Sequence, residues 1–186
     1  KLLDYAINSA LAFSNISLRK NDKAGLITFA KKVDTIVGAS NKKTHLNTIN
    51  DALYNITTKY TDADFGYLYA VIKRKITQRS LLILYTNFEH ISSLKRQLPF
   101  LKAISKHHLL VVVFFENTEL DTLIKENAED LQTIYHKTIA EKFAYEKRLI
   151  VKELERNGIY GILTKPKNLT VNVINKYLEF KAKGFI

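Results

Sequence analysis

Length, composition and charge exclude several classes of protein. The chain has 186 residues, 46% of them hydrophobic and 25% charged, which is typical of a globular domain with a substantial core. It contains no cysteine, so disulfides, thiolate metal sites and cysteine catalysis are excluded. No apolar run approaches the roughly 20 residues needed to cross a bilayer. We therefore expect a single domain over residues 1–186.

The net charge is +11, from 29 basic and 18 acidic residues. Such a surplus favours anionic partners, which include nucleic acid, acidic lipid head groups and acidic protein faces, without selecting among them. The basic residues are spread along the chain, and no zinc-finger spacing or RNA-binding aromatic signature accompanies them. A solvated basic surface accounts for this charge, and nucleic acid is not the expected partner.

The first part of the chain predicts a helix, a hairpin and a second helix. Apolar residues recur at helical spacing over residues 1–19. Two short apolar stretches follow at 25–30 and 33–37, and only two lysines separate them, which predicts an antiparallel hairpin. Thr44 then precedes another helical pattern and is the expected N-cap of that helix.

Strands and helices alternate along the rest of the chain. Helices are expected over residues 65–76, 92–104, 119–127, 128–156 and 169–183, and strands over 80–86, 109–115 and 159–163. Pro99 should kink its helix or lie near the start, and Asn157-Gly158 should end the long helix before it. The stretch LLVVVFF at 109–115 is the strongest strand signal and should be central or covered on both faces.

This alternation predicts an α/β fold. The expected architecture is a mostly parallel sheet with one antiparallel edge hairpin and with helices on both faces. Within it, the stretch SLLILYTNFEH at residues 80–90 reads as a buried strand followed by polar residues. Ligands bind beyond the carboxyl ends of such strands, so Thr86, Asn87, Glu89 and His90 mark the candidate site. The alternative is that these residues only cap the next helix.

Three stretches, taken in order, resemble a known family. They are KLLDYAINSALAFSNISLRKNDKAGLITFA, RSLLILYTN and LERNGIYGILTKPKNLTVNVINKYLEFKAKGFI. Together they resemble the bacterial von Willebrand factor A-like proteins of domain-of-unknown-function family fifty-eight, over nearly the whole chain. The most specific part is the last stretch, in which a helix that ends at a glycine precedes a short strand, a proline and a final helix.

The resemblance implies a von Willebrand A-like, Rossmann-type sheet flanked by helices. It also implies a physical association with MoxR-type AAA+ ATPases. Members of the family commonly carry amino-terminal membrane segments, which this chain does not show. The expected location is therefore the cytoplasm, with any membrane association made through segments that the chain does not contain.

The metal site of A domains, as the resemblance implies it, joins three loops. It needs a D-x-S-x-S loop, a threonine from a later loop and an aspartate after the fourth strand, whose oxygen atoms hold Mg²⁺. No D-x-S-x-S occurs in the chain, Thr44 matches the threonine, and Asn87 stands at the aspartate position without a negative charge. We therefore expect no metal and no cofactor. The expected interaction edge consists of Thr44, Thr86, Asn87, Glu89 and His90, with Thr44 as a plain helix cap as the alternative.

The resemblance also has a consequence for the sheet. In the family the first strand lies centrally, between the second and the fourth, and the chain has no counterpart of it, so it looks amino-terminally truncated. The strands at 25–30 and 80–86 would then each keep an inner edge unpaired, at about 1–3 kcal/mol for each buried group left without a partner. We expect them to pair directly, which needs no partner, or to take a strand from another copy or from a partner chain.

The sequence contains no complete catalytic set. The five histidines stand outside H-E-x-x-H and other metal-ligand spacings: His45, His90, His107, His108 and His136. There is no G-x-S-x-G elbow and no glycine-rich phosphate loop. Asp62 and Asp64 fit a polar turn, while Glu146 and Arg148 fit an ordinary helix surface.

The leading hypothesis is therefore a non-enzymatic protein-interaction module that works with a MoxR-type ATPase. The alternative is a basic binding module for an anionic polymer or a membrane surface. An enzyme has no residues to recommend it.

Overall fold

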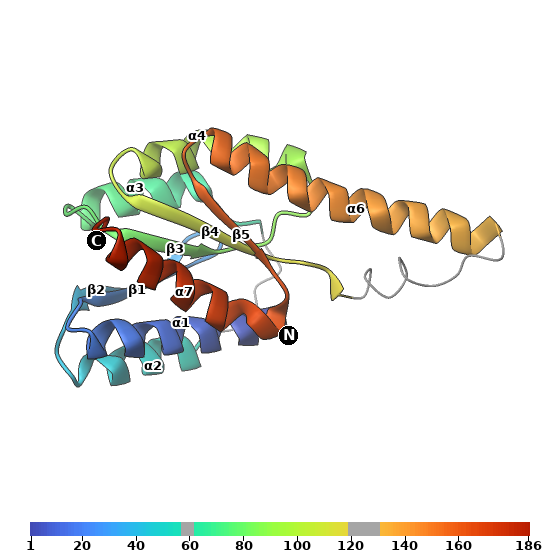
Figure 1. Ribbon diagram of the computed structural model, residues 1–186. Helices are drawn as coiled ribbons and strands as arrows, with labels where there is room; N and C mark the ends of the chain where they lie inside the picture. Colours follow the sequence, from blue (N-terminus) through green and yellow to red (C-terminus); the bar gives the residue numbers. More distant parts are fainter. Residues whose placement is uncertain (57–61, 119–130) are drawn as a thin grey trace. The chain divides into compact units, whose positions relative to one another are not determined.

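The structure is a computed structural model of mixed α/β architecture (Figure 1). It describes residues 1–56, 62–118 and 131–186. The α/β class expected from the alternating pattern is confirmed. No helix within these ranges is long and apolar enough to cross a membrane. The helix expected at 119–127 lies outside the described residues.

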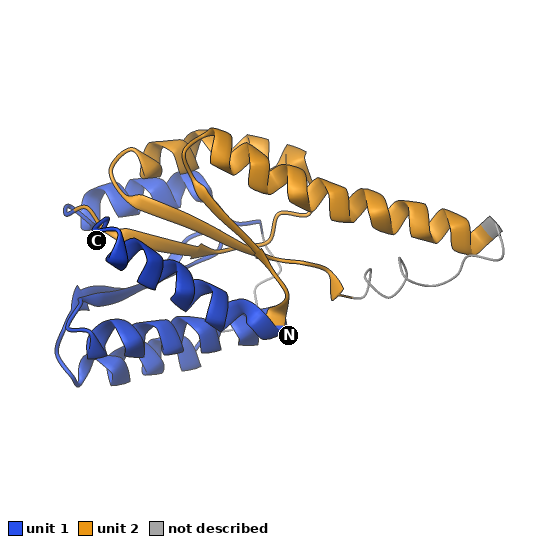
Figure 2. Cartoon of the chain, in the orientation of Figure 1, with its two compact units in different colours: residues 1–78, 167–186 blue, residues 79–166 orange. Residues whose placement is uncertain are grey.

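The chain divides into two compact units (Figure 2). Unit 1 consists of residues 1–78 and 167–186, and unit 2 of residues 79–166. Each unit has its own sheet. The sequence predicted a single domain. Whether the two units together form one domain is not tested by the structure, so this stays a prediction.

The described part of unit 1 combines four α-helices with a hairpin. Its elements are α1 (Leu2–Arg19), β1 (Ala24–Phe29), β2 (Val33–Ser40), α2 (His45–Tyr54), α3 (Phe65–Lys75) and α7 (Leu169–Ala182), the last preceded by the short 3-10 helix η1 (Pro166–Asn168). Each helix and strand expected over this part of the sequence forms, with ends that differ by a few residues.

The hairpin of unit 1 is antiparallel, as the two-lysine gap predicted. The strands approach closely at Gly25, where a Cβ atom would lie 2.9 Å from the carbonyl oxygen of Val37 and 3.1 Å from the nitrogen of Ala39. A glycine is needed there because any side chain would push the backbone of β2 away. The pairing register shifts between Ala24 and Leu26, on either side of this glycine.

One apolar cluster of unit 1 lies between α1, α2 and the hairpin. Ala24, Ile49 and Leu53 are its buried members, and partly buried residues of α1, β1 and β2 pack against them. On α1 the buried hydroxyl of Ser14 donates to the carbonyl oxygen of Ala10 at 2.8 Å, which satisfies it without a partner outside the helix. Helix α1 can therefore bury polar positions at little cost.

The described part of unit 2 is a three-stranded parallel sheet with two crossover helices. Its elements are β3 (Leu81–Tyr85), α4 (Ile91–Ser105), β4 (Leu109–Phe115), α6 (Leu131–Arg156) and β5 (Tyr160–Thr164), and the strand order is β3-β4-β5. Helix α4 contacts β4, α6 contacts β5, and the two helices contact each other, so both cover the same face of this sheet (Figure 1). Gly158, with φ at +72°, ends the α6 segment as predicted.

Strand β4 is the centre of this sheet. Leu110 to Phe115 are all buried, and successive side chains point to opposite faces of a strand, so both faces of β4 lie away from solvent. The prediction of a central strand at 109–115 is confirmed to the residue. β3 lies at one edge of the sheet and is mostly half-buried.

The strands are described within each unit. The sequence pattern predicted one sheet with an edge hairpin, and the described strands form an antiparallel pair in unit 1 and a three-stranded parallel sheet in unit 2. The strands at 25–30 and 80–86 lie in different units, so their direct pairing stays a prediction. An apolar pattern identifies a strand but carries little information about which distant strand it pairs with. Pairing with another copy or a partner chain stays a prediction.

Candidate functional site

The candidate site begins where β3 ends. The N–H of Thr86 donates to the carbonyl oxygen of Val113 at 3.0 Å, so the pairing with β4 continues one residue past the strand. The loop through Asn87 and Glu89 follows, and His90 is the N-cap of α4. The His90 side chain makes no capping hydrogen bond. The alternative that these polar residues only cap the helix is therefore incomplete, because two of them bond instead to α6.

Lys147 of α6 holds this loop. Its Nζ donates to the amide oxygen of Asn87 at 2.8 Å and to the carbonyl oxygen of Phe88 at 2.6 Å. The same ammonium lies 5.7 Å from the centre of the Phe114 ring. Burial lowers the pKa of Lys147 below its ordinary value, and the carboxylate of Glu89 opposes that shift. The loop is thus tied to the helix by a half-buried cation.

A second contact lies beside the first. The Nδ1 atom of His90 lies 3.0 Å from a carboxylate oxygen of Glu146, and its ring packs at 5.5 Å against Phe143. The His90 side chain is 46% exposed and Glu146 only 19%. The histidine therefore presents part of its ring to solvent while its orientation is fixed by α6.

This arrangement bears on metal binding. The Asn87 oxygen already accepts a hydrogen bond from an ammonium group, and a divalent cation at that oxygen would meet the positive charge of Lys147. Within the described ranges, no group of three or more histidine, aspartate or glutamate residues could hold a metal ion.

Thr44 lies in unit 1, whereas the other four predicted site residues lie in unit 2. It occupies the N-cap position of α2 as predicted, but its hydroxyl makes no capping hydrogen bond, and its backbone is helical at φ −71° and ψ −12°. The N-cap of α3 behaves differently, because Asp64 accepts a hydrogen bond from the N–H of Tyr67 at 2.8 Å. A shared edge of Thr44 with the loop after β3 stays a prediction.

The two histidines before β4, His107 and His108, lie in the short connection between α4 and β4. The N–H groups of His107 and His108 both donate to the carbonyl oxygen of Ile104 at 3.1 Å, which ends α4. The side chain of His108 is buried, and burial, assisted by the neighbouring His107, lowers the pKa of His108 below its ordinary value. A buried ring at this position suits a structural role in the link from α4 to β4.

Sequence reasoning missed Lys147 and misjudged Glu146, which was expected on an ordinary helix surface. A signal for Lys147 exists in the sequence. It lies on the same helical stripe as Ala140, Ala144 and Leu154, which are buried or half-buried, so it is a lysine at a position where the pattern calls for an apolar residue. Such a lysine indicates a buried polar partner.

A polar cluster in unit 1 was also missed. The hydroxyl of Tyr177 and the ammonium of Lys181 both donate to the same carboxylate oxygen of Asp22, the latter at 2.6 Å. Burial raises the pKa of Asp22, but the hydrogen bonds from Lys181 and Tyr177 outweigh it and leave that pKa below its ordinary value. The ring of Tyr177 also meets Phe13 edge-on, with ring centres 5.3 Å apart. The cluster joins the turn after α1 to α7.

The fold and this geometry define a mixed α/β protein with a loop fixed at the carboxyl edge of a small parallel sheet. Comparison of the chain with protein-family models, with curated proteins and with solved structures found no match. The contacts of the described residues therefore provide the structural basis for the functional argument.

Proposed function

We propose that the chain is a non-enzymatic protein-interaction module of the von Willebrand A-like type, which works with a MoxR-type AAA+ ATPase. The resemblance of the three stretches supports the type of module and the ATPase. The observation that carries the interaction itself is the edge of β3. This strand is apolar along its whole length and, among the described residues of unit 2, has a strand neighbour on one side only.

The direction of the backbone groups of β3 follows from its pairing with β4. The carbonyl oxygen of Ser80 accepts from Leu109, and the N–H of Thr86 donates to Val113, so the even-numbered residues face β4. By alternation, the N–H and C=O of Leu81 and Ile83 point away from β4. No described strand pairs with that side.

Such an edge is a template for strand addition. Edge strands are commonly protected by a lysine, a proline or a bulge, and β3 contains none of these. A partner strand would gain main-chain hydrogen bonds along the edge, and the fixed loop after β3 would supply polar contacts for specificity. His90 and Glu89 are exposed at the position where such a partner would continue.

Catalysis is not proposed because the pair formed by His90 and Glu146 has no nucleophile among its described side-chain contacts. The described contacts of His90 are those with Glu146 and Phe143, and neither supplies a hydroxyl or thiol that the ring could activate. Lys147 has a lowered pKa, but its ammonium already bonds to two oxygen atoms of the loop.

The test replaces one backbone donor. Ile83→Pro removes an N–H that faces away from β4, a position where an edge strand tolerates proline. Binding of the 186-residue chain to a MoxR-type AAA+ ATPase should weaken at least about tenfold, whereas Ile83→Val should leave it unchanged. The N–H of Leu82 faces β4, so Leu82→Pro should disturb the fold. This variant is the control that shows how much binding is lost through unfolding alone. Unchanged binding by a folded Ile83→Pro variant would contradict the proposal.

The alternative function is binding to an anionic polymer or membrane surface. One observation favours it: residues 65–115 contain eight lysines and arginines and a single acid, Glu89. Salt separates the two functions, because an interface with several phosphate contacts loses about 10³-fold or more in affinity between 50 and 200 mM salt. Strand addition to an apolar edge should lose far less over the same range. A steep loss for the ATPase complex would favour the alternative.

A further inference from the structure

Helix α4 carries charge of one sign only. Four basic residues and no aspartate or glutamate lie between Ile91 and Lys106. Lys95, Lys102 and Lys106 are spaced seven and four residues apart, which places them on one face because α-helices repeat every 3.6 residues. All three are exposed, and none forms an ion pair with the described residues.

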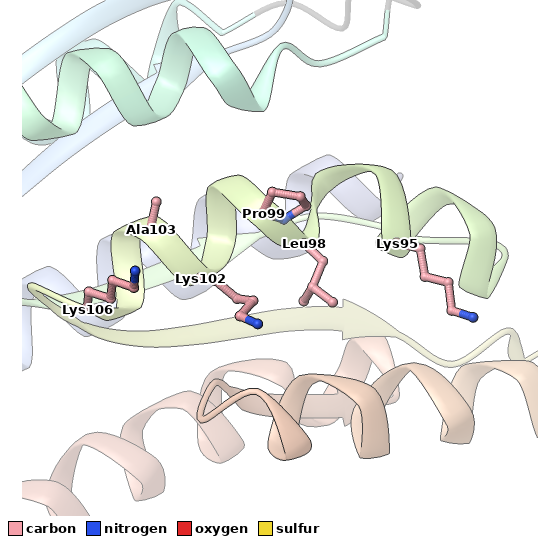
Figure 3. Close-up of a pocket in the computed structure, with 6 residues that line it drawn as sticks. All are labelled: Lys95, Leu98, Pro99, Lys102, Ala103 and Lys106. Carbon is pink, nitrogen blue, oxygen red and sulfur yellow. The ribbon is translucent and has the colours of Figure 1, made fainter.

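The same face is hollowed. A depression of about 380 Å³ is lined by Lys95, Leu98, Pro99, Lys102, Ala103 and Lys106 (Figure 3). The Leu98 side chain lies between those of Lys95 and Lys102 and points the same way, whereas Pro99 and Ala103 point to the opposite side of the helix (Figure 3). The methylene stems of the lysines add to this apolar lining. The face therefore offers both positive charge and apolar surface.

Pro99 shapes the hollow. It lies inside α4 rather than near its start, one of the two placements expected from the sequence. A proline has no N–H for the carbonyl four residues earlier, here that of Lys95, and its ring pushes that carbonyl aside. Pro99 lines the hollow at this turn, between the first lysine of the row and the second.

The combination selects one kind of occupant. The rises from Lys95 to Lys102 and from Lys102 to Lys106 are about 10 Å and about 6 Å. On a second helix that lies along α4, carboxylates with the same sequence spacing would be separated by the same axial distances. Each of the three lysines could therefore pair with one carboxylate at the same time. An apolar residue between those carboxylates would fill the hollow. A bare polyanion has nothing to bury there, and a flat membrane surface does not enter a concave one.

We propose that the α4 groove, lined by Lys95, Lys102, Lys106 and the three apolar residues between them, is a docking site for an acidic amphipathic helix of a partner protein. This site is separate from the β3 edge, so each can fail without the other. Its affinity rests on three exposed charge pairs and a small apolar contact, which is typical of a transient partner.

The experiment uses the full 186-residue chain and a designed peptide as probe. The peptide, of about 18 residues with an alanine-rich background to favour helix, carries glutamates at the lysine spacing and leucines on their two flanks. Affinity is measured by fluorescence anisotropy. The affinities of three alternative ligands are measured for comparison. They are a second peptide with serine in place of the leucines, a short DNA duplex and vesicles containing phosphatidylserine.

The variant Lys95→Gln/Lys102→Gln/Lys106→Gln should bind the peptide at least about tenfold more weakly. The matched control is Lys31→Gln/Lys32→Gln/Lys43→Gln, which removes the same charge from exposed positions in unit 1 and should stay within about twofold of the wild type. The serine peptide should also bind about fivefold or more weakly than the leucine peptide. Circular dichroism checks that both variants are folded.

Four results would overturn the proposal. The groove variant binds the peptide like the wild type, or the control variant loses as much affinity as the groove variant. The serine peptide binds as tightly as the leucine peptide, which would leave charge as the only attraction. The duplex or the vesicles bind more tightly than the peptide and lose affinity in the groove variant, which would assign the same lysines to phosphate.

Discussion

The two units of this chain solve the problem of covering a sheet in opposite ways. In unit 2 the strands are parallel, each connection must cross the sheet, and the crossing helices cover one face of it. In unit 1 the hairpin closes through a short turn, and residues of β2 alternate between half-buried and exposed over most of its length. Burial is therefore concentrated in β4 and spread thinly over β1 and β2.

The polar contacts of the two units also differ in burial, and those of unit 2 are the more buried. In unit 2 the ammonium of Lys147 is drawn into the protein, against the ring of Phe114 and two loop oxygen atoms. In unit 1 the Asp22 side chain that bonds Lys181 is still 39% exposed. Breaking a hydrogen bond costs more when the groups left behind are away from water. The two units should consequently respond to mutation on different scales.

The largest expected effect is in β4. Phe114→Ala removes a ring that is fully buried and should lower the free energy of unfolding by about 3–5 kcal/mol, since the lost apolar burial is joined by the cost of a cavity. Urea unfolding followed by circular dichroism measures the change. The comparison is Ile36→Ala in β2, whose side chain is 42% exposed and which should cost about 1 kcal/mol or less. Equal losses in the two variants would contradict the contrast between the sheets.

An intermediate effect is expected at Lys147. Lys147→Ala leaves the amide oxygen of Asn87 and the carbonyl oxygen of Phe88 without their donor, which should cost about 1–3 kcal/mol in unfolding free energy. Lys142→Ala removes the same charge from an exposed position of the same helix and should stay within about 0.5 kcal/mol of the wild type. Hydrogen exchange at residues 86–90 should speed up in the first variant only. Slow exchange there in Lys147→Ala would show that the loop is held by other contacts.

The parts of the fold that the sequence predicted well depend on local pattern. The run LLVVVFF identified β4, the two-lysine gap identified the hairpin, and Gly158 ended the long helix, because each signal lies within the element it describes. Strand pairing was harder to predict, because it joins residues far apart in sequence. The edge position of β3 could not be read from its apolar run, which resembles that of a central strand.

Only the local part of the candidate site was predictable, because its other residues are distant in sequence. Its loop follows from the general position of sites beyond the ends of parallel strands. Its partners on α6 lie 56 to 60 residues further along, where a lysine and a glutamate on a helix are by default surface charges. The capping hydrogen bond of Thr44 was expected from residue type alone, and the helical backbone at that position does not support it.

The smallest expected effect concerns the tie of unit 1 and its dependence on pH. The folded pKa of Asp22 lies below the ordinary value of an aspartate side chain. The carboxylate therefore contributes its full stabilisation above the ordinary value and loses it as the pH falls through the lower folded pKa. Asp22→Asn should lower the free energy of unfolding by about 1 kcal/mol or less at neutral pH, because the pair is partly exposed.

Acid should then remove the difference between Asp22→Asn and the wild type, since the protonated aspartic acid and the asparagine are both neutral. Urea unfolding at neutral pH and at several acidic values measures this convergence. Asp51→Asn, an exposed position on α2, is the matched control and should follow the wild type at neutral pH. Tyr177→Phe keeps the carboxylate but removes one of its two donors, so it should lie between the wild type and Asp22→Asn. A constant difference between Asp22→Asn and the wild type down to the lowest pH would show that the side chain acts through packing, and the contrast with the buried tie of Lys147 would then need another cause.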